Sequence, residues 1–205
     1  MSNIILLGAN GHAKVIIDML HKQKREVYDD IFLLDDNSEL LGHTIMGHKV
    51  VGQISECTKY EDSKFVISIG KNAVCKSLAQ KYDLDYMTLI HPSAIIGEEV
   101  HIAKGSVVMA GAVINSGAVI GEHCIVNTGA TVDHDCRIAN YVHLSPGVHL
   151  GGTVSIDEGT WLGIGSCCKN NIHIGKQVII GAGGVVVRDI LESGTYVGVP
   201  VKKIN

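Results

Sequence analysis

Apolar side chains recur at every sixth position across almost half of the chain. From Ile96 to Val186, sixteen consecutive positions at this spacing carry Ile, Val, Leu or Cys. These positions are Ile96, Ile102, Val108, Ile114, Ile120, Val126, Val132, Ile138, Leu144, Leu150, Ile156, Leu162, Cys168, Ile174, Ile180 and Val186. Small or β-branched residues often stand two positions earlier, and Gly, Asn, Asp or Ser often follows. An amphipathic helix repeats its apolar stripe every ~3.6 residues, so the pattern excludes one.

A period of six predicts a short strand and a corner, with one large aliphatic side chain pointing inward on each side. Such repeats are typical of a parallel β-helix, in which each coil buries its apolar row against the neighbouring coils. Three sides of six residues make a triangular coil, so residues one coil apart should stack at about 4.8 Å. A β-sandwich is the alternative, but its strands turn every ~8–12 residues and drift in register.

The chain before the repeat has the pattern of a small α/β unit. The run NIILL at Asn3–Leu7 predicts a buried parallel strand, which ends at the turn GANGH. Apolar residues at helical spacing then predict a helix over Ala13–Leu20. Further apolar runs predict strands at Ile31–Leu34 and Lys64–Ile69, the second of them followed by another helical stretch.

Each predicted strand ends in residues suited to a ligand. Gly8–His12 lies between a strand and a helix start, where backbone N–H groups and the positive helix end attract a phosphate. Asp35 and Asp36 close the second strand, where carboxylates accept hydrogen bonds from ribose hydroxyls or a base, and Gly70 closes the third. Open α/β sheets bind ligands at this edge, so the three strand ends support one another. The alternative is a glycine-permitted tight turn beside a solvated acidic loop.

The boundary between the two parts falls at the sequence HPS, because the residue before proline is extended and the six-residue frame begins directly afterwards. We therefore expect a half-Rossmann βαβαβ domain over residues 1–90 and a β-helix domain with a short tail over residues 91–205. About 90 residues are too few for both halves of a dinucleotide-binding fold. The first domain should therefore bind a nucleoside diphosphate attached to another group rather than NAD.

Composition limits the classes of partner that the chain can bind and indicates its cellular compartment. The formal net charge of −4 and the absence of a basic run argue against nucleic acid. No stretch approaches the ~20 apolar residues of a membrane span, and the N-terminal sequence lacks the charged region of a signal peptide. The six cysteines form no C-x-x-C pair, and Cys124, Cys136 and Cys168 fall at inward positions. We expect a reduced, cytoplasmic protein.

The densest polar segment of the repeat is VNTGATVDHDC at Val126–Cys136. His134 lies two residues past an inward valine, so it should sit at a corner and face out of the coil. A carboxylate from Asp133 or Asp135 on one ring nitrogen would fix the tautomer and raise the basicity of the other nitrogen, as in a general base. Gly152 lies one coil further on and should stack against His134, where its N–H could stabilise an oxyanion.

Other interpretations of these residues stay open. His134 could be an ordinary surface histidine beside acidic neighbours. The surface interpretation is the one adopted for His101, His123, His149 and His173. Cys136 is a rival nucleophile, but its inward position argues against that role. No metal ligands are assigned, because the histidines are spread over different coils without an H-x-x-x-H or H-x-E pair.

The hexapeptide frame, the VNTGATVDHDC segment and the terminal GVPVKKI resemble the left-handed β-helix acyltransferases. With GANGHAKVI, LDD and ISIGKN included, the chain from Ile4 to Ile204 resembles the bacterial nucleotide-sugar N-acetyltransferases of the bacillosamine and perosamine type. The sialic acid O-acetyltransferases of capsule clusters share this layout. The resemblance implies a left-handed parallel β-helix after the half-Rossmann domain. It also implies acetyl-CoA as co-substrate, no permanently bound cofactor, and a homotrimer with sites between adjacent β-helices.

The resemblance further implies roles for single residues. His134 would be the base and Asp135 the carboxylate that raises its basicity. Acetyl-CoA would contact His143 and the backbone at Gly152, Ile164 and Ala182. The nucleotide-sugar phosphates would bind at Asn10, Gly11 and His12, and the base or ribose at Asp35 and Asp36, with Gly70 contacting the same ligand. Lys202 and Lys203 could meet the CoA phosphates, although a solvated basic tail explains them equally well.

The expected function is direct acetyl transfer from acetyl-CoA to the amine of a nucleotide-linked 4-amino-4,6-dideoxy sugar, with His134 as base and no covalent acetyl-enzyme. O-acetylation of sialic acid or another surface-polysaccharide sugar would use the same residues and is the main alternative. Outside this class, a non-catalytic β-helix scaffold would make His134 incidental. A β-helix carbonic anhydrase would require bound zinc.

Overall fold

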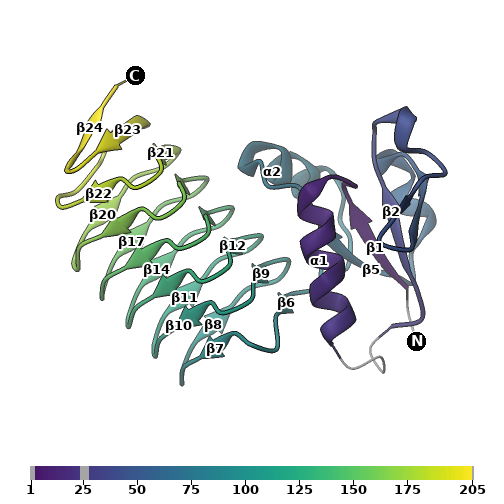
Figure 1. The fold of residues 1–205 in the computed structure, drawn as a ribbon, viewed down its shortest axis with the longest axis horizontal. Helices are drawn as coiled ribbons and strands as arrows, with labels where there is room; N and C mark the ends of the chain where they lie inside the picture. The colour runs from purple at the N-terminus through teal and green to yellow at the C-terminus, as the bar shows by residue number, and fades with distance from the viewer. Residues whose placement is uncertain (1–2, 24–27, 205) are drawn as a thin grey trace. The chain divides into compact units, whose positions relative to one another are not determined.

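The computed structural model describes residues 3–23 and 28–204 and forms two compact units, Met1–Thr88 and Leu89–Asn205 (Figure 1). The change between the units falls two residues before the boundary expected from the sequence. None of the helices in the described part of the chain has the length and apolar character needed to cross a membrane.

A five-stranded sheet forms the centre of the first unit. Its strands are β1 (Ile4–Leu7), β2 (Ile31–Leu34), β3 (Thr44–Ile45), β4 (His48–Gly52) and β5 (Lys64–Ile67), in the order β3-β4-β2-β1-β5. The helices are α1 (Gly11–Lys22), α2 (Asn72–Lys81) and the short 3-10 helices η2 (Ser38–Leu40) and η3 (Ile54–Lys59). β1 is buried along its whole length and pairs in parallel with β2 and β5. The three predicted strands and both predicted helices are therefore present.

The path between β2 and β5 differs from a simple βαβαβ order. β3 and β4 form an antiparallel hairpin, and η3 follows where a crossover helix would stand. The hairpin turn residues Met46 and Gly47 both have positive φ, 48° and 90°. Two-residue hairpin turns usually contain Asn-Gly or Asp-Gly, so the Met-Gly pair did not indicate a hairpin in the sequence.

The second unit is a parallel β-helix with three faces. Face 1 comprises β6 (Leu89–Ile90), β9 (Val107–Val108), β12 (Ile125–Val126), β15 (His143–Leu144), β18 (Trp161–Leu162), β21 (Val178–Ile180), β23 (Gly194–Gly198) and β24 (Val201–Lys203). Face 2 comprises β7 (Ile95–Ile96), β10 (Val113–Ile114), β13 (Thr131–Val132), β16 (His149–Leu150), β19 (Cys167–Cys168) and β22 (Val185–Val186). Face 3 comprises β8 (His101–Ile102), β11 (Val119–Ile120), β14 (Arg137–Ile138), β17 (Ser155–Ile156) and β20 (His173–Ile174).

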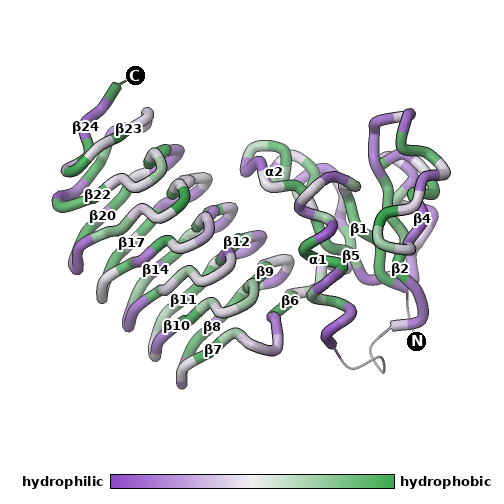
Figure 2. The backbone as a smooth tube through the Cα atoms, viewed as in Figure 1, coloured by the Kyte–Doolittle hydropathy of each residue, from purple (hydrophilic) through white to green (hydrophobic). Residues whose placement is uncertain are grey.

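The register of these faces confirms the predicted coil. Val113 pairs in parallel with Thr131, and His143 with Trp161, so partners are one coil of 18 residues apart. Apolar strands and more polar corners alternate along the coils in Figure 2. At the C-terminal end, β23 joins β21 in parallel and turns back as the antiparallel strand β24.

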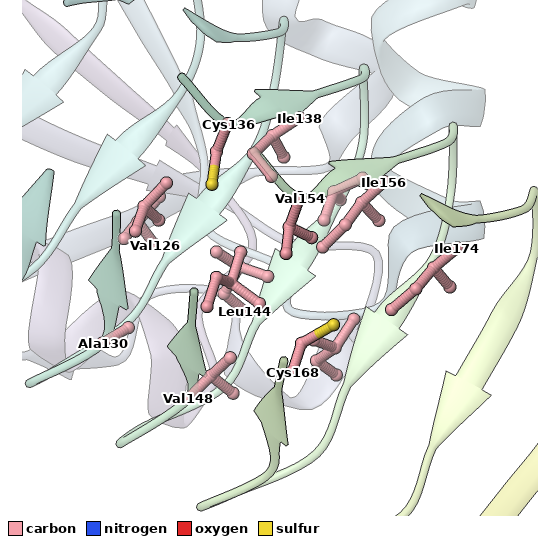
Figure 3. Close-up of a cluster of buried hydrophobic side chains, with 14 of the residues drawn as sticks. Val126, Ala130, Cys136, Ile138, Leu144, Val148, Val154, Ile156, Cys168 and Ile174 are labelled. Atoms are coloured by element: carbon pink, nitrogen blue, oxygen red, sulfur yellow. The ribbon is translucent and has the colours of Figure 1, made fainter. Parts of the chain in front are cut away.

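The predicted apolar positions fill the interior of the β-helix (Figure 3). Every sixth residue from Val108 to Val186 is buried, and so are the inward cysteines Cys124, Cys136 and Cys168. Ile96 and Ile102 stay partly exposed because, in the described part of the chain, β7 and β8 are the first strands of their faces. The narrow interior takes aliphatic side chains rather than rings, in keeping with an aromatic content of only 4%.

The corners of the coil depend on residues with positive φ. At the first corner, between faces 1 and 2, glycine adopts this conformation in five successive coils. These residues, which we call the glycine row, are Gly111, Gly129, Gly147, Gly165 and Gly183, with φ between 64° and 68°. The second corner lies between faces 2 and 3, and the third corner lies between faces 3 and 1. At these corners non-glycine residues such as Asp135 and Tyr141 also have a positive φ. Among the described residues, a Cβ on Gly111, Gly129, Gly165 or Gly183 would meet no atom within 4 Å, so packing against them does not require glycine there.

Candidate active site

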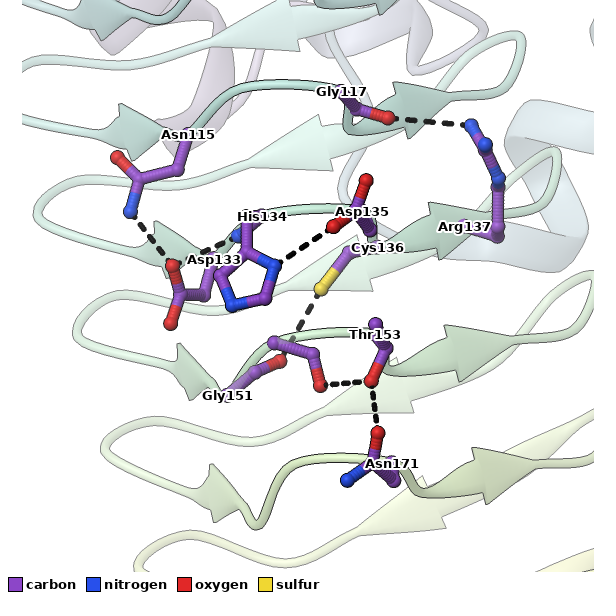
Figure 4. Close-up of polar contacts among 11 residues, drawn as sticks. Asn115, Gly117, Asp133, His134, Asp135, Cys136, Arg137, Gly151, Thr153 and Asn171 are labelled. Carbon is purple, nitrogen blue, oxygen red and sulfur yellow. Dashed lines mark hydrogen bonds and ion pairs between the residues drawn. The ribbon is translucent and has the colours of Figure 1, made fainter.

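His134 and Asp135 form a hydrogen-bonded pair at the second corner (Figure 4). The Nδ1 atom of His134 lies 2.8 Å from the Oδ2 atom of Asp135, and more than half of each side chain is exposed. Asp135 has a φ of 59°, and this left-handed backbone lets its carboxylate reach back to the preceding ring. The predicted outward histidine with a carboxylate partner is therefore present.

Asp133 supports the same pair from the other side. Its Oδ1 atom accepts hydrogen bonds from the His134 backbone N–H and from Nδ2 of Asn115, both at 2.8 Å. These two bonds hold the pKa of Asp133 below its usual value, so it carries a negative charge beside the ring. The pKa of His134 is raised, first by the hydrogen bond to Asp135 and then by the charge of Asp133. The free Nε2 atom is therefore a stronger base than that of an isolated histidine.

Two glycines leave room for this pair in the neighbouring coils. A Cβ on Gly152 would lie 2.5 Å from Nε2 of His134, and a Cβ on Gly117 would lie 2.9 Å from Oδ1 of Asp135. Gly152 therefore stacks directly against the basic nitrogen, as its spacing predicted. Among the described residues, its N–H has no acceptor, which leaves that donor available beside the base.

Cys136 follows the pair but points into the coil. It is buried, and its thiol donates to the carbonyl oxygen of Gly151 at 3.3 Å. Burial raises the pKa of this thiol, so the nucleophilic thiolate is disfavoured. Burial also raises the pKa values of Cys124 and Cys168, each to about 12. The structure therefore favours a base at this corner over a cysteine nucleophile.

A mainly apolar groove of about 430 Å³ runs along face 1 and the first corner. It is lined by residues that include His143, Ile164 and Ala182 from the predicted acetyl-CoA set, together with Asn127, Trp161 and Ile179. Gly152 is not part of this lining; it belongs to the second corner. Within one chain, the predicted acetyl-CoA residues are therefore divided between two corners, with face 2 between them.

His143 is fixed inside this groove. It is only 8% exposed, its Nε2 atom lies 3.3 Å from Nδ2 of Asn127, and its ring stacks on Trp161 with a centroid distance of 5.6 Å. Sequence reasoning did not single out Asn127 or Trp161. The available signal was their spacing, since Trp161 is one coil from His143 and Asn127 nearly so.

In the first unit, the predicted ligand residues gather at the carboxyl ends of β1, β2 and β5, which are adjacent strands. Asn10 caps α1 from an exposed position without a side-chain hydrogen bond to the helix, and Gly11 and His12 open the helix. Gly70 follows β5. The turn after β1 requires glycine at Gly8, where φ is 114° and a Cβ would lie 2.6 Å from the Ile69 side chain.

Asp35 and Asp36 already organise this edge of the sheet. The Oδ2 atom of Asp35 accepts from the Ala9 N–H at 2.7 Å, and its Oδ1 atom accepts from the Asn37 N–H at 2.8 Å. The Oδ1 atom of Asp36 accepts from the Ile54 N–H at 3.0 Å. Both carboxylates therefore shape the loops around the predicted nucleotide site, in addition to any contact with a ligand.

The four histidines that were expected at the surface, His101, His123, His149 and His173, divide into two kinds. His101 and His149 are exposed, and Nε2 of His173 lies 3.1 Å from Oδ2 of Asp157 in a half-exposed contact. The surface interpretation of His123 is wrong, because this residue is 4% exposed and stacks on Tyr141. Its φ of 53° turns the side chain back over Gly105, where a Cβ would lie 2.4 Å from the ring, and burial lowers its pKa.

The terminal lysines and the possible metal ligands remain to be placed. Lys203 pairs with Glu192 at 3.1 Å, so one of the two terminal lysines has an acidic partner. In residues 3–23 and 28–204, no three His, Cys, Asp or Glu side chains converge where they could hold a metal ion.

Comparison with known proteins gives consistent matches for both units. Residues 3–82 match the family model described as the PglD N-terminal domain. The chain is 39% identical over 119 residues to the UDP-N-acetylbacillosamine N-acetyltransferase of Bacillus subtilis (strain 168), which covers 54% of this chain and 52% of that protein. This match thus spans about half the length of the relative.

Two solved structures match over essentially the whole chain. The acetyltransferase domain of PglB from Neisseria gonorrhoeae FA1090 has a TM-score of 0.93 and 34% identity, covering 100% of both chains. PerB from Caulobacter crescentus, in complex with CoA and GDP-perosamine, has a TM-score of 0.91 and 34% identity, covering 100% of this chain and 98% of that one. These matches confirm the predicted fold class, a Rossmann-like α/β domain followed by a left-handed parallel β-helix.

Proposed function

The chain belongs to the bacillosamine and perosamine family of nucleotide-sugar N-acetyltransferases, and from this premise we propose that it transfers the acetyl group of acetyl-CoA to the amine of a nucleotide-linked 4-amino-4,6-dideoxy sugar. The observation that carries the proposal is the His134–Asp135 pair. More than half of the His134 side chain is exposed, and Gly152, which lies beside the Nε2 atom, has no side chain to block an acceptor. A base with a raised pKa and open access is what an attacking amine needs.

The groove on face 1 supports acetyl-CoA as the donor. Its apolar lining suits the pantetheine arm, and His143 provides one polar group among the lining side chains. The glycine row runs beside the groove through five coils. At the other two corners, residues with side chains also adopt a positive φ. A smooth glycine edge lets a long, thin ligand approach the backbone closely, parallel to the axis of the coil.

The separation of the two corners supports a site shared between copies of the chain. His134 and Gly152 lie at the second corner, whereas His143, Ile164 and Ala182 lie along the first corner and face 1. A homotrimer of side-by-side β-helices would bring the second corner of one copy against the groove of the next. Each of its three sites would then take its base from one chain and most of its acetyl-CoA contacts from another.

The first unit is assigned to the acceptor. Asn10, Gly11 and His12 surround the start of α1, where the sugar diphosphate would meet backbone N–H groups. Asp35 and Asp36 hold the neighbouring loops and would present the base or ribose site, with Gly70 at the end of the third strand. PerB, a relative at 34% identity, was solved with GDP-perosamine, which supports a nucleotide-linked sugar as the acceptor class here.

The proposed reaction is a direct transfer. The sugar amine attacks the thioester carbonyl while His134 Nε2 takes its proton, and the backbone N–H at Gly152 stabilises the oxyanion. The C–N bond forms, the C–S bond breaks, and CoA leaves as a thiolate that regains a proton. Asp135 keeps the imidazole oriented and stabilises its charged form. No acetyl-enzyme is invoked, since the nearby Cys136 thiol is buried with a raised pKa.

The test is thiol release from acetyl-CoA with a panel of acceptors. The panel contains UDP-, GDP- and dTDP-linked 4-amino-4,6-dideoxy sugars, together with free and CMP-linked sialic acid. Turnover on an amino sugar, with the amide confirmed by mass spectrometry, is the expected result. Turnover on sialic acid alone would replace N-acetylation by ester formation, and no turnover on any member would contradict the proposed acceptor class.

A further inference from the structure

Trp161 is the only tryptophan in the chain, and none of the roles assigned above involves it. It stands on the outer surface of face 1, lines the groove, and keeps 39% of its surface exposed. Ile164 and Ile179 beside it are 62% and 42% exposed. Large apolar side chains clustered in a groove indicate a surface that a ligand covers.

Two contacts hold the indole in one orientation. It stacks on the His143 ring with an interplanar angle of 9°, because β15 and β18 place these residues in register. Its Nε1–H donates to the Oγ atom of Ser145 at 2.7 Å. On its other side, Ile179 of β21 is its register partner. The ring is therefore fixed before any ligand arrives, so binding against it costs little side-chain entropy.

Trp161 in turn fixes His143. The edge of the imidazole is set by Asn127, whose Nδ2 atom lies 3.3 Å from Nε2, and one of its faces is covered by the indole. Removing the indole would uncover one face of this ring and release its tilt.

We propose that Trp161 is an acyl-CoA-binding residue of this groove that also positions His143. The pantetheine arm of the CoA ester packs its methylene groups against the exposed part of the indole, and the stacked pair holds the thioester end in register with the coil. This inference rests on the proposed function, because it requires acetyl-CoA to occupy the groove. It adds a specificity-determining residue to those that the family resemblance implied.

Three variants separate the contacts. Trp161→Leu removes the stacked ring but leaves an apolar side chain, and Trp161→Phe keeps a ring but loses the bond to Ser145. Tyr141→Leu is a matched control, because Tyr141 stacks on His123 at the same centroid distance of 5.6 Å but belongs to the third corner. Thermal midpoints and circular dichroism identify any variant that fails to fold.

The expected result is a selective loss of donor binding. Trp161→Leu should raise the KM for acetyl-CoA about tenfold, Trp161→Phe about threefold, and Tyr141→Leu should leave it unchanged. The KM for the acceptor should stay constant in all three. A loss that fell equally on both substrates would mean that Trp161 acts only through the fold.

The single tryptophan also provides a direct optical measurement. CoA added to the wild-type protein should change the fluorescence emission of Trp161 until the change saturates. The Kd from this titration should equal the Kd from calorimetry. The same titration of the Tyr141→Leu variant should give the same Kd, because Tyr141 lies at the third corner and does not line the groove. CoA binding by calorimetry without an emission change, combined with an unchanged KM in Trp161→Leu, overturns the inference and leaves the proposed function intact. No CoA binding at all overturns both.

Discussion

The sharpest prediction concerns a methyl group added next to the base. In Gly152→Ala, the new Cβ would lie 2.5 Å from Nε2 and 2.7 Å from Cε1 of His134. An ordinary contact between such atoms is about 3.5 Å, so the imidazole must move by roughly 1 Å. Gly152 has no positive φ, so alanine introduces no backbone strain at this position. The substitution should therefore displace the His134 ring, the proposed base, without disturbing the coil.

The structure sets the size of the expected effect. A displacement of roughly 1 Å at a reacting group costs about 10²-fold in rate, so kcat/KM should fall by about that factor. The thermal midpoint should change little, because more than half of the side chain that must move is exposed. Steady-state thiol release and a thermal melt measure the two quantities on the same preparation.

The double variant supplies the control. The three atoms nearest to the new Cβ all belong to the His134 ring. In a His134→Ala background, Gly152→Ala should therefore cause little further loss, because the methyl group has no ring to displace. A further large loss, with a raised KM for acetyl-CoA, would refute this reasoning. It would show that Gly152 acts through contact with the donor rather than through space for the base.

Four other substitutions test the remaining assignments. His134→Ala should lower kcat/KM by roughly 10²–10⁴ with an unchanged thermal midpoint, and a large drop in the midpoint with a modest rate loss would make His134 structural. If His134 is the base, it must be neutral to act, so kcat/KM should fall as the pH drops through its raised pKa. Asp135→Asn removes the main cause of that raised pKa and should move the acid limb of the pH profile to lower pH. An acid limb that did not move would show that Asp135 does not set the pKa of the base. Asp35→Ala loses two bonds to backbone N–H groups and should lower the thermal midpoint by several degrees while raising the acceptor KM, and no change in either would remove Asp35 from the site. Cys136→Ser should keep most of the activity measured by thiol release, and a loss beyond about tenfold would restore the cysteine as nucleophile.

Much of the second unit could be predicted because one short-range rule governs it. The six-residue spacing fixes which side chains point inward, and the coil length then fixes which residues stack. The outward corner position of His134 and its stacking against Gly152 followed from that rule, whereas the choice of Asp135 over Asp133 as its partner came from the family resemblance. His123 did not, because its burial depends on a left-handed backbone and a missing Cβ at Gly105, neither of which the apolar spacing encodes.

The less predictable features depend on contacts that local patterns do not describe. Asp35 was expected to face a ligand, but its two carboxylate oxygens also accept bonds from Ala9 and Asn37, one of them 26 residues away. The β3–β4 hairpin has a turn without the usual residue pair. The division of the predicted acetyl-CoA residues between two corners is likewise absent from a list of motif positions. It emerges only when each residue is placed on its face of the coil.

The 18-residue register has a consequence for how this sequence can change over evolutionary time. Side-chain hydrogen bonds join Asn115 to Asp133, Thr131 to His149, and Thr153 to Asn171, and each pair is separated by 18 residues. Compensating substitutions should therefore arise at this interval, and far less often between sequence neighbours, which point to different sides of the wall. Epistasis would then couple mainly residues that are stacked along the axis of the coil, in columns with an 18-residue spacing. A whole coil could be duplicated or lost with each column kept intact, which gives such a protein a ready means of altering its length without redesigning its interior.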